Sequence, residues 1–265
     1  MREVKTVEEL RALQMQTMDV IDIFCKKQGL SYSLAGGTLI GAIRHKGYIP
    51  WDDDIDIYMP RADYDKFLKT FDGFNERYKV YEWRNYPGME ILFAKVGDTK
   101  TRLIEQGLMR EYGVYVDIFP LDGVPVDEKK QRKIFYKKLA LYILAHGKSQ
   151  KYPSGQSLAN KLRWIASKLW PFSKRATFNK IYKLITCCPD SDIVTNMVSM
   201  GSNNPNDAFP ISLFHPTKAV AFEDRQYQIM AGYDTYLRKR FGDYMKLPPE
   251  DKRVGAHDLI AYIND

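Results

Sequence analysis

Residues 33–59 constrain the fold and the chemistry of this chain more than any other stretch. They read S-L-A-G-G-T-L-I-G-A-I-R-H-K-G-Y-I-P-W-D-D-D-I-D-I-Y-M. Because side chains alternate along a strand, Ile55 and Ile57 would share one face, and Asp54 and Asp56 the other. Two carboxylates about 7 Å apart on one face repel each other unless a cation lies between them. The pattern predicts a Mg²⁺ or Mn²⁺ site on a strand whose apolar face is anchored in the core.

An acidic surface loop is the alternative interpretation of this Asp cluster. Against it, the acids run directly into an apolar, strand-like segment, and Pro50 and Trp51 are poor components of a flexible tether. Gly36-Gly37 before Thr38 also resembles a phosphate-binding turn, because a helix that starts there leaves its first backbone N–H groups available to an anion. Gly36, Gly37 and Thr38 are therefore candidate phosphate-binding residues.

A further acidic position lies in residues 114–120, V-Y-V-D-I-F-P. Apolar residues flank Asp117, so the pattern predicts a lone carboxylate inside a strand, which is costly if it stays unpaired. Asp117 is either a structural residue bonded to the backbone or to an arginine, or the third carboxylate of a site with Asp54 and Asp56. Asp122, which precedes a glycine, is expected in a turn.

Four basic residues are candidates for contacts with phosphate. Arg44, His45 and Lys46 lie between the glycines and the acids, where cations can contact a nucleotide donor. The alternative is a solvated basic loop. Lys95 falls in a predicted strand, either as an exposed edge residue or as a further phosphate contact.

The composition bounds the partners and the compartment. The chain has 265 residues, 45% hydrophobic and 28% charged, with a net charge of +7. This surplus favours anionic partners such as nucleotides, phosphorylated glycans or an anionic membrane surface; we expect no nucleic acid among them. Three cysteines without metal-ligand spacing indicate a reducing compartment. No signal-like stretch and no run near the ~20 apolar residues of a membrane span is found, which predicts a cytoplasmic protein.

The central stretch resembles the signature of the LicD family, phosphotransferases of the nucleotidyltransferase fold that are related to fukutin and the fukutin-related protein. V-D-I-F-P-L-D-G and Y-L-R-K-R-F-G-D-Y-M-K-L-P-P extend the resemblance to most of the chain. One departure is Met230-Ala231-Gly232, where the family often has a proline. The residues that carry the match in the central stretch are Gly36, Gly37, Thr38, Leu39, Gly41, Ala42, Ile43, Arg44, His45, Lys46, Gly47, Trp51, Asp52, Asp53, Asp54, Ile55, Asp56 and Ile57.

The resemblance implies an α/β (α+β) fold with a nucleotidyltransferase-type mixed β-sheet core, flanked by helices and carrying a helical insertion. We expect a single catalytic domain over residues 1–265, with the core in 1–125, the insertion in 126–190 and a C-terminal part, 191–265, that packs back on the core. The resemblance also favours Asp117 as a member of the site with Asp54 and Asp56, where Asp117 would bind metal or take a proton.

For function, the resemblance implies metal-dependent transfer of phosphorylcholine from CDP-choline to a sugar hydroxyl of a lipid-linked teichoic-acid or other surface-glycan precursor. Transfer of ribitol phosphate or glycerol phosphate from a CDP-polyol, nucleotidyl transfer to a small acceptor, and a catalytically silent glycan-binding protein are the alternatives. A choline group would favour an aromatic cage. Aromatic residues close to the motifs, each of which could instead belong to the core, are Tyr32, Tyr48, Trp51, Tyr58, Trp83, Tyr86 and Tyr115.

Periodicity and capping signals place the remaining elements. Thr6 and Glu9 form a capping-box pattern at the start of a helix that ends at Gly29. Further helices are expected over 62–71, 128–147, 162–170, 176–186 and 233–241, and strands over 78–83, 91–96, 114–120 and 219–222.

Residues 161–175 allow two interpretations. An apolar stripe of Leu162, Ile165 and Leu169 is surrounded by Lys and Arg, as in a helix that lies on an anionic membrane surface. In that case the protein would contact the inner face of the plasma membrane peripherally. Otherwise the stripe packs on the sheet and the cations are only solvated.

Overall fold

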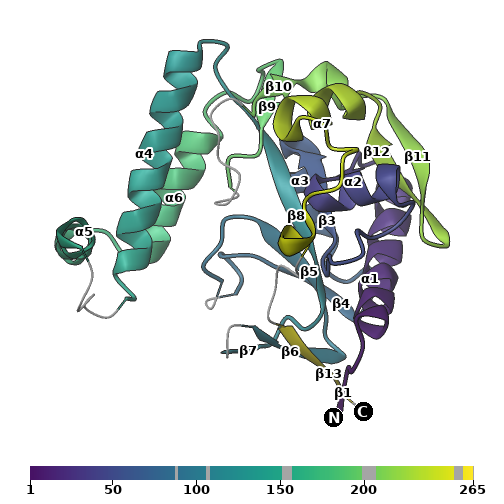
Figure 1. Ribbon diagram of the computed structural model, residues 1–265. Coiled ribbons are helices and arrows are strands. Elements are labelled where there is room, and N and C mark those ends of the chain that lie inside the picture. Colours follow the sequence, from purple (N-terminus) through teal and green to yellow (C-terminus); the bar gives the residue numbers. More distant parts are fainter. Residues whose placement is uncertain (87–88, 106–107, 151–156, 199–206, 254–258, 265) are drawn as a thin grey trace.

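The computed structural model describes residues 1–86, 89–105, 108–150, 157–198, 207–253 and 259–264 (Figure 1). Helices alternate with strands in a mixed α/β architecture, as the sequence predicts. The helices are α1 (Val7–Gln28), α2 (Gly36–Arg44), α3 (Arg61–Thr70), α4 (Glu128–Gly147), α5 (Leu158–Leu169), α6 (Lys174–Ile185) and α7 (Tyr233–Phe241), with 3₁₀ turns η1 (Ile211–Leu213) and η2 (Glu250–Lys252).

Thirteen strands are formed by the described residues. They are β1 (Arg2–Glu3), β2 (Ser33–Leu34), β3 (Asp56–Pro60), β4 (Tyr78–Tyr81), β5 (Ala94–Asp98), β6 (Thr101–Glu105), β7 (Leu108–Arg110), β8 (Tyr115–Gly123), β9 (Ile193–Thr195), β10 (Phe209–Pro210), β11 (Thr217–Phe222), β12 (Arg225–Met230) and β13 (Leu259–Ile263).

The central sheet is organised around β8, its longest strand. β3 pairs with one edge of β8 in parallel. On the other edge, β5 pairs with its first half and β9 with its last two residues, both antiparallel. β2, β4 and β10 complete a seven-stranded sheet. A parallel pair at the centre of an otherwise antiparallel sheet makes this a mixed sheet.

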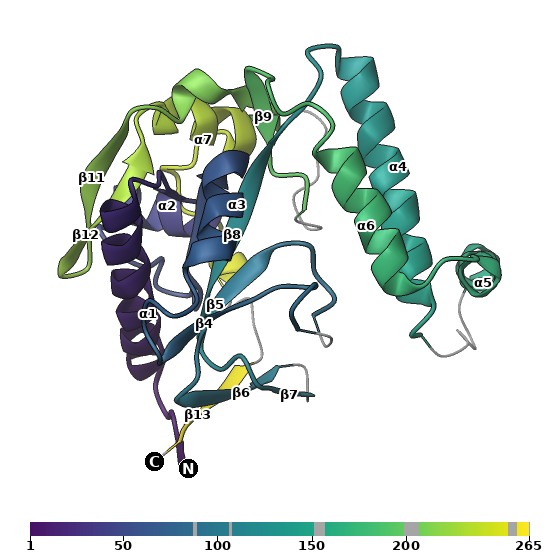
Figure 2. The same cartoon turned by 180° about the vertical axis from the view of Figure 1, so that it is seen from behind.

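One face of this sheet forms the main core. Ile57, Val96, Val116 and Ile118 are fully buried on it, since side chains of one parity point to the same side. Helices α1 and α3 pack against this face, as Figure 2 shows from behind. The opposite face carries Asp56, Lys95 and Asp117 and is the polar side of the sheet.

Helix α1 follows its capping signals closely. The Thr6 side chain accepts a hydrogen bond from the backbone N–H of Glu9, and the helix ends at Gly29, which has φ 63°. A left-handed residue at this position favours glycine. The predicted limits of α4 and of α7 also agree with the structure.

Three helices lie beside the sheet as a separate layer (Figures 1 and 2). Helices α4 and α6 pack side by side, and α5 is attached to the C-terminal end of α4. Residues 151–156, which precede α5, lie outside the described residues. Among the described helices, none is both long and apolar enough to cross a membrane.

Two smaller sheets surround the central one. β1, β13, β6 and β7 form a four-stranded sheet that brings the chain ends together, since Arg2 pairs with Ile263. β6, β7 and β13 were not predicted from the sequence. β11 and β12 form a hairpin whose β11 packs on α2. The strands expected over 78–83 and 91–96 are β4 and β5, which start or end up to three residues away from the predicted limits.

Candidate active site

Three neighbouring strands place three ionisable side chains in one row on the polar face of the sheet. Asp117 of β8 is directly opposite Asp56 of β3 and opposite Lys95 of β5. Lys95 Nζ lies 2.7 Å from Asp117 Oδ1. Lys95 is only 5% exposed, so it is neither an edge residue nor a solvated one. The carboxylates of Asp56 and Asp117 are thus brought together by strand register, across 61 residues of sequence.

The N-terminus of α2 faces the acids. Gly36 has φ +52°, and a Cβ there would lie 3.4 Å from Asp56 Oδ2; at Gly37 a Cβ would lie 2.7 Å from Asp52 Oδ2. Thr38 Oγ1 accepts a hydrogen bond of 2.9 Å from the Asp56 backbone N–H. Glycine is favoured at Gly36 by its positive φ and at Gly37 by the close approach of Asp52, and the helix begins at Gly36. A helix N-terminus at this place is suited to an anion.

Asp54 lies in the loop before β3, not in the strand itself, which begins at Asp56. The prediction that both acids belong to one strand was wrong in this respect. The loop is pinned to α1, because Arg11 donates hydrogen bonds to the carbonyls of Ile49 and Asp52, and Gln14 donates to that of Asp53. These bonds hold the acidic loop against the rigid scaffold.

The acids carry an excess of negative charge. Burial raises the pKa of Asp56 well above its usual range, and the charges of Asp54 and Asp117 raise it further, while Lys95 opposes them. Burial also raises the pKa of Asp117 to about 6, although the Lys95 ammonium lowers it. Like charges held together in a poorly solvated place are typical of functional sites.

The donor set suits a hard divalent cation, because carboxylate oxygens in a region of surplus negative charge are the ligands that Mg²⁺ and Mn²⁺ prefer. Besides burial, the charge of Asp54 raises the pKa of Asp56, so these two carboxylates are candidates to hold one ion together. Across the described ranges, no three Asp, Glu, His or Cys side chains converge closely enough to hold a metal. To become a third metal ligand beside Asp54 and Asp56, Asp117 would have to give up its ion pair with Lys95.

The basic triplet lies at the other end of α2. Arg44 Nη1 donates a 2.6 Å hydrogen bond to the carbonyl of Tyr244, and its Nε contacts His45. Burial and the charge of Arg44 lower the pKa of His45. Lys46 has φ 64° and its carbonyl accepts from the backbone of Glu223. Arg44 and Lys46 thus tie α2 to the C-terminal part, and these contacts do not bring the triplet to the acids.

One cation of the site was not predicted from the sequence. Arg240 of α7 lies close enough to Asp56 for the two charges to interact, and its guanidinium also bonds Asp207 at 2.7 Å. The only sequence signal was its place in the Y-L-R-K-R-F-G string of the C-terminal block.

A cavity of about 670 Å³ opens beside Asp117 and Lys95, between the sheet and α4. Glu105 on its wall accepts hydrogen bonds from the hydroxyls of Tyr112 (2.6 Å) and Tyr115 (3.3 Å). Burial raises the pKa of Glu105, but these bonds and the Lys95 charge outweigh it and the net pKa is lowered. The aromatic side chains on its wall are Phe93, Tyr112, Tyr115 and Tyr142. Of the predicted cage residues, Tyr115 lies here, while Tyr32, Tyr48 and Tyr58 are in the core.

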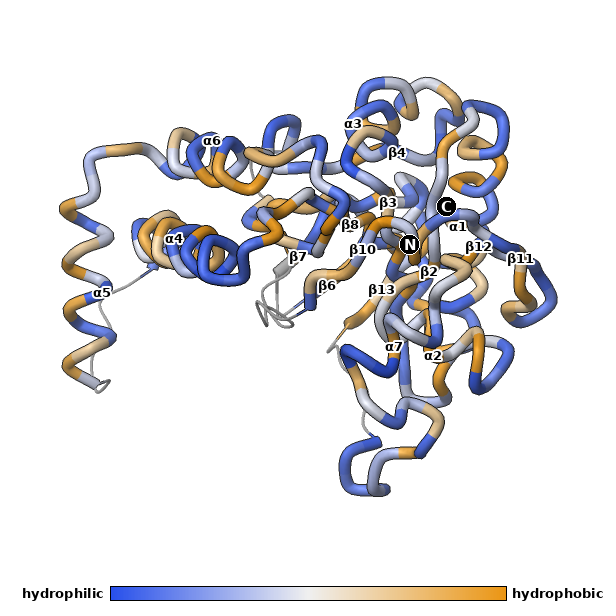
Figure 3. The backbone as a smooth tube through the Cα atoms, turned by 90° about the horizontal axis from the view of Figure 1, so that it is seen from above, coloured by the Kyte–Doolittle hydropathy of each residue, from blue (hydrophilic) through white to orange (hydrophobic). Residues whose placement is uncertain are grey.

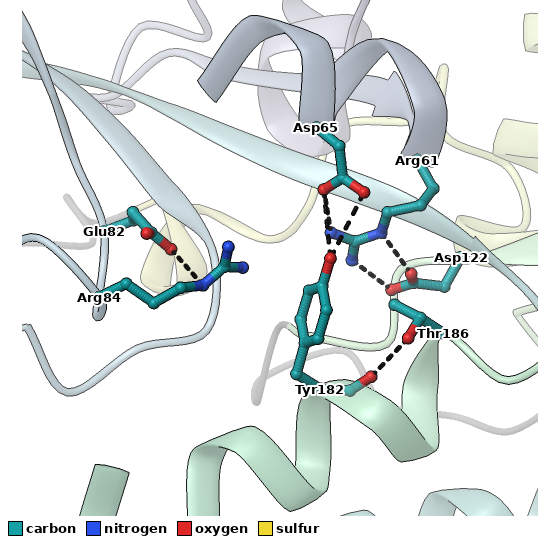
Figure 4. A network of polar contacts seen from close by, with 7 residues as sticks. All are labelled: Arg61, Asp65, Glu82, Arg84, Asp122, Tyr182 and Thr186. Carbon is teal, nitrogen blue, oxygen red and sulfur yellow. Dashed lines mark hydrogen bonds and ion pairs between the residues drawn. The ribbon is translucent and has the colours of Figure 1, made fainter. Parts of the chain in front are cut away.

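Asp122 is a structural residue and was wrongly expected in a turn. It lies within β8, is 0% exposed and receives two hydrogen bonds from Arg61, Nε to Oδ1 at 2.7 Å and Nη2 to Oδ2 at 3.0 Å. Figure 4 shows the pair together with Asp65 of α3 and Tyr182 of α6, whose hydroxyl points to Asp65. This network joins α3, β8 and α6.

Two carboxylates in register on a mixed sheet, with a glycine-initiated helix beside Asp56 and a cavity beside Asp117, are the arrangement expected of an enzyme that acts on phosphate groups. Comparison with known proteins specifies the family. The model "LicD/FKTN/FKRP, nucleotidyltransferase domain" matches residues 29–139, which include all three acids and Lys95. The chain belongs to the LicD family and is a phosphotransferase.

Similarity to one relative covers nearly the whole chain. The "Lipopolysaccharide cholinephosphotransferase LicD" of Haemophilus influenzae is 32% identical over 268 residues, 96% of this chain and 98% of that protein. Shorter matches are an uncharacterized protein of Rickettsia typhi, 35% identical over 26% of this chain and 23% of its own, and one of Rickettsia prowazekii, 49% identical over 14% of each.

Proposed function

We propose that this protein transfers phosphorylcholine from CDP-choline to a sugar hydroxyl of a teichoic-acid or other cell-surface glycan precursor, with Mg²⁺ or Mn²⁺ as cofactor. The near full-length similarity to a cholinephosphotransferase supports the transferred group. The acceptor would be carried on a lipid at the inner face of the plasma membrane, with the enzyme in the cytoplasm.

In this reaction the acceptor hydroxyl oxygen attacks the phosphorus that bears choline. The bond from this phosphorus to the bridging oxygen breaks, and CMP leaves with the electron pair. Asp117 would take the hydroxyl proton; a pKa of about 6 at the edge of the cavity supports this role, because it is close to that of an effective general base. The backbone N–H groups at Gly36 and Gly37 and the charge of Arg240 would bind the donor phosphates. A divalent cation on Asp54 and Asp56 would neutralise the diphosphate.

The aromatic cavity next to Asp117 is the observation that favours a choline donor over a polyol donor. Its wall combines aromatic faces with a Glu105 carboxylate whose lowered pKa keeps it ionised. Lys95 Nζ lies 3.3 Å from the ring centroid of Tyr115, so the wall already accommodates an ammonium group. A quaternary ammonium is recognised by such aromatic and acidic surroundings, whereas a polyol needs hydrogen-bond donors and acceptors.

Product analysis tests the reaction. The protein is incubated with CDP-choline, a divalent cation and a lipid-linked glycan fraction, and the products are separated by mass spectrometry. We expect CMP in solution and phosphorylcholine on the glycan. Release of phosphorylcholine with CMP on the acceptor would show nucleotidyl transfer instead. Faster turnover of CDP-ribitol or CDP-glycerol than of CDP-choline would assign a polyol donor.

The cavity is tested by Phe93→Leu, which keeps apolar volume and removes one aromatic face. We expect the KM for CDP-choline to rise about tenfold, the size of one good cation–π contact. Phe74→Leu, whose partly buried ring packs against Phe24 and is not among the residues that line the cavity, is the matched control and should leave KM unchanged. An equal KM in Phe93→Leu would exclude this part of the wall from choline binding.

A further inference from the structure

Helix α5 carries an apolar stripe that the fold leaves uncovered. With 3.6 residues per turn, its four members fall on one side of the helix. They are Leu158 (72% exposed), Leu162 (55%), Ile165 (44%) and Leu169 (78%). Phe172, just beyond the helix, is 37% exposed. The interpretation that this stripe packs on the sheet is therefore wrong. Aliphatic side chains gathered on one exposed face mark an interaction surface.

The opposite side of α5 is fixed to the protein. Ser167 is buried and packs against Gly147 at the end of α4, where there is no room for a Cβ. Trp164 Nε1 donates to the carbonyl of Gln150, and Lys148 Nζ to that of Trp170. These contacts orient the stripe away from the body. Figure 3 shows α5 at the edge of the molecule, apart from the sheets.

The segment that carries the stripe is rich in cations and contains no acidic residue. Residues 158–188 contain no Asp or Glu, and their Lys and Arg residues are Lys161, Arg163, Lys168, Lys174, Arg175, Lys180 and Lys183. Arg163, Arg175, Lys180 and Lys183 are exposed. The ammonium of Lys168 bonds the carbonyl of Lys148, and that of Lys174 pairs with Glu90. An apolar stripe inside an acid-free basic segment fits a surface that is both apolar and anionic.

We propose that α5 docks this protein on the surface of an anionic phospholipid bilayer, with the stripe inserted at the boundary between headgroups and acyl chains. A second copy of the chain is a poorer occupant, because pairing α5 with α5 would bring cations together without any carboxylate to neutralise them. The proposal rests on exposure and charge, and it is independent of the reaction proposed above. It places α4, and with it one wall of the cavity, beside the bilayer.

Co-sedimentation with vesicles tests the proposal. The purified protein is mixed with phosphatidylcholine vesicles, with and without phosphatidylglycerol, at low and high KCl. We expect binding only to vesicles that contain phosphatidylglycerol, and a loss of binding as KCl increases. The absence of binding at low salt would overturn the proposal.

Two sets of variants locate the contact. Leu162→Gln, Ile165→Gln and Leu169→Gln together should abolish binding, because the inserted apolar area is lost. Lys161→Gln with Arg163→Gln should weaken binding roughly 30-fold, from the charge of two residues near the surface. The controls are Ile23→Gln, on an α1 residue that is 56% exposed, and Lys69→Gln with Lys79→Gln. Binding that survives the triple change would contradict the role of α5.

Two further measurements distinguish bilayer docking from self-association and from catalysis. Sedimentation velocity without vesicles should show a monomer for both the parent and the triple variant; a dimer that the triple change dissociates would identify a second copy as the occupant and overturn the proposal. Transfer from CDP-choline to a water-soluble acceptor should be equal in the parent and the triple variant, so that failure of the reaction and failure of docking are distinguished.

Discussion

Strand β8 carries two buried carboxylates, one near each end, and their surroundings differ. The guanidinium of Arg61 donates two hydrogen bonds to Asp122, which is 0% exposed. Asp117 has one contact to the ammonium of Lys95, lies beside Asp56 and opens on the cavity at 8% exposed. Asp122 thus has a guanidinium that bonds both of its oxygens. Asp117 has one ammonium, Lys95, whose charge also acts on Asp56 and Glu105.

This difference is the basis for proposing a structural role for Asp122 and a catalytic role for Asp117. The guanidinium of Arg61 bonds both oxygens of Asp122, and burial keeps solvent and ligands away from this carboxylate. Burial raises the pKa of both acids despite their cations, that of Asp117 to about 6. Asp117 differs in that it lines the cavity. Both acids lie in the same apolar strand, so the strand pattern does not distinguish them; their neighbouring charges and their exposure to the cavity do.

The largest effect is expected from Asp56→Asn, and from Asp54→Asn in the same way. Transfer should fall below detection, because the pair that would hold the cation is broken. Asp56→Asn should leave the Tm unchanged or raise it, since a source of repulsion is removed from the cluster. Turnover and differential scanning calorimetry on the same preparations test both statements. Full activity of the parent in excess EDTA would exclude the metal.

Asp117→Asn is expected to lower turnover at least about 10²-fold, the usual contribution of a general base. It also leaves Lys95 buried without its counter-charge, so stability should decrease. The double variant Asp117→Asn with Lys95→Met separates the two effects. It should recover the Tm while turnover stays low. Recovery of turnover together with Tm would make Asp117 a structural acid like Asp122.

Asp122→Asn should do the opposite. Removing one partner of a buried ion pair costs about 3–5 kcal/mol, which corresponds to a fall in Tm of roughly 10 °C for a chain of this size. Turnover per folded molecule should remain at the parent level. Asp190→Asn, at an exposed position, is the control for both measurements. A normal Tm in Asp122→Asn would show that the Arg61 pair contributes little.

Lys138 provides a comparison with these paired acids, because burial alone shifts its pKa. It is 0% exposed, and its Nζ has no hydrogen-bond partner among the described residues. Burial lowers its pKa to about 8, so the unfolded chain binds more protons between pH 8 and pH 10.5, and the contribution to stability rises with pH in that window. Lys138→Met should raise stability near pH 7 by roughly 1–3 kcal/mol and remove this slope. Urea unfolding at several pH values measures it, and an unchanged slope would contradict the shift.

Local signals in the sequence predicted the parts of the fold that local chemistry controls. The capping residue Thr6 and the terminal Gly29 set the limits of α1. The acids and the glycine pair were predicted to belong to one site, and the structure brings Gly36 next to Asp56. β13 was missed because its pairing depends on a partner distant in sequence, since Ile260 of β13 is opposite Ile104 of β6. β6 and β7 pair with each other locally and were also missed.

By itself, the sequence determined which residues are candidates for the chemistry, since Asp54, Asp56 and Asp117 lie in motifs that are recognisable from residue order alone. Only the tertiary structure decided which charged side chain lies next to each acid. Strand register put Lys95 against Asp117 and Arg61 reached Asp122 across 61 residues, and neither contact follows from spacing. It also decided that the stripe of α5 faces outward, because the amphipathic pattern is the same whether a helix covers a sheet or a membrane, and only the packing of Ser167 against α4 distinguishes the two.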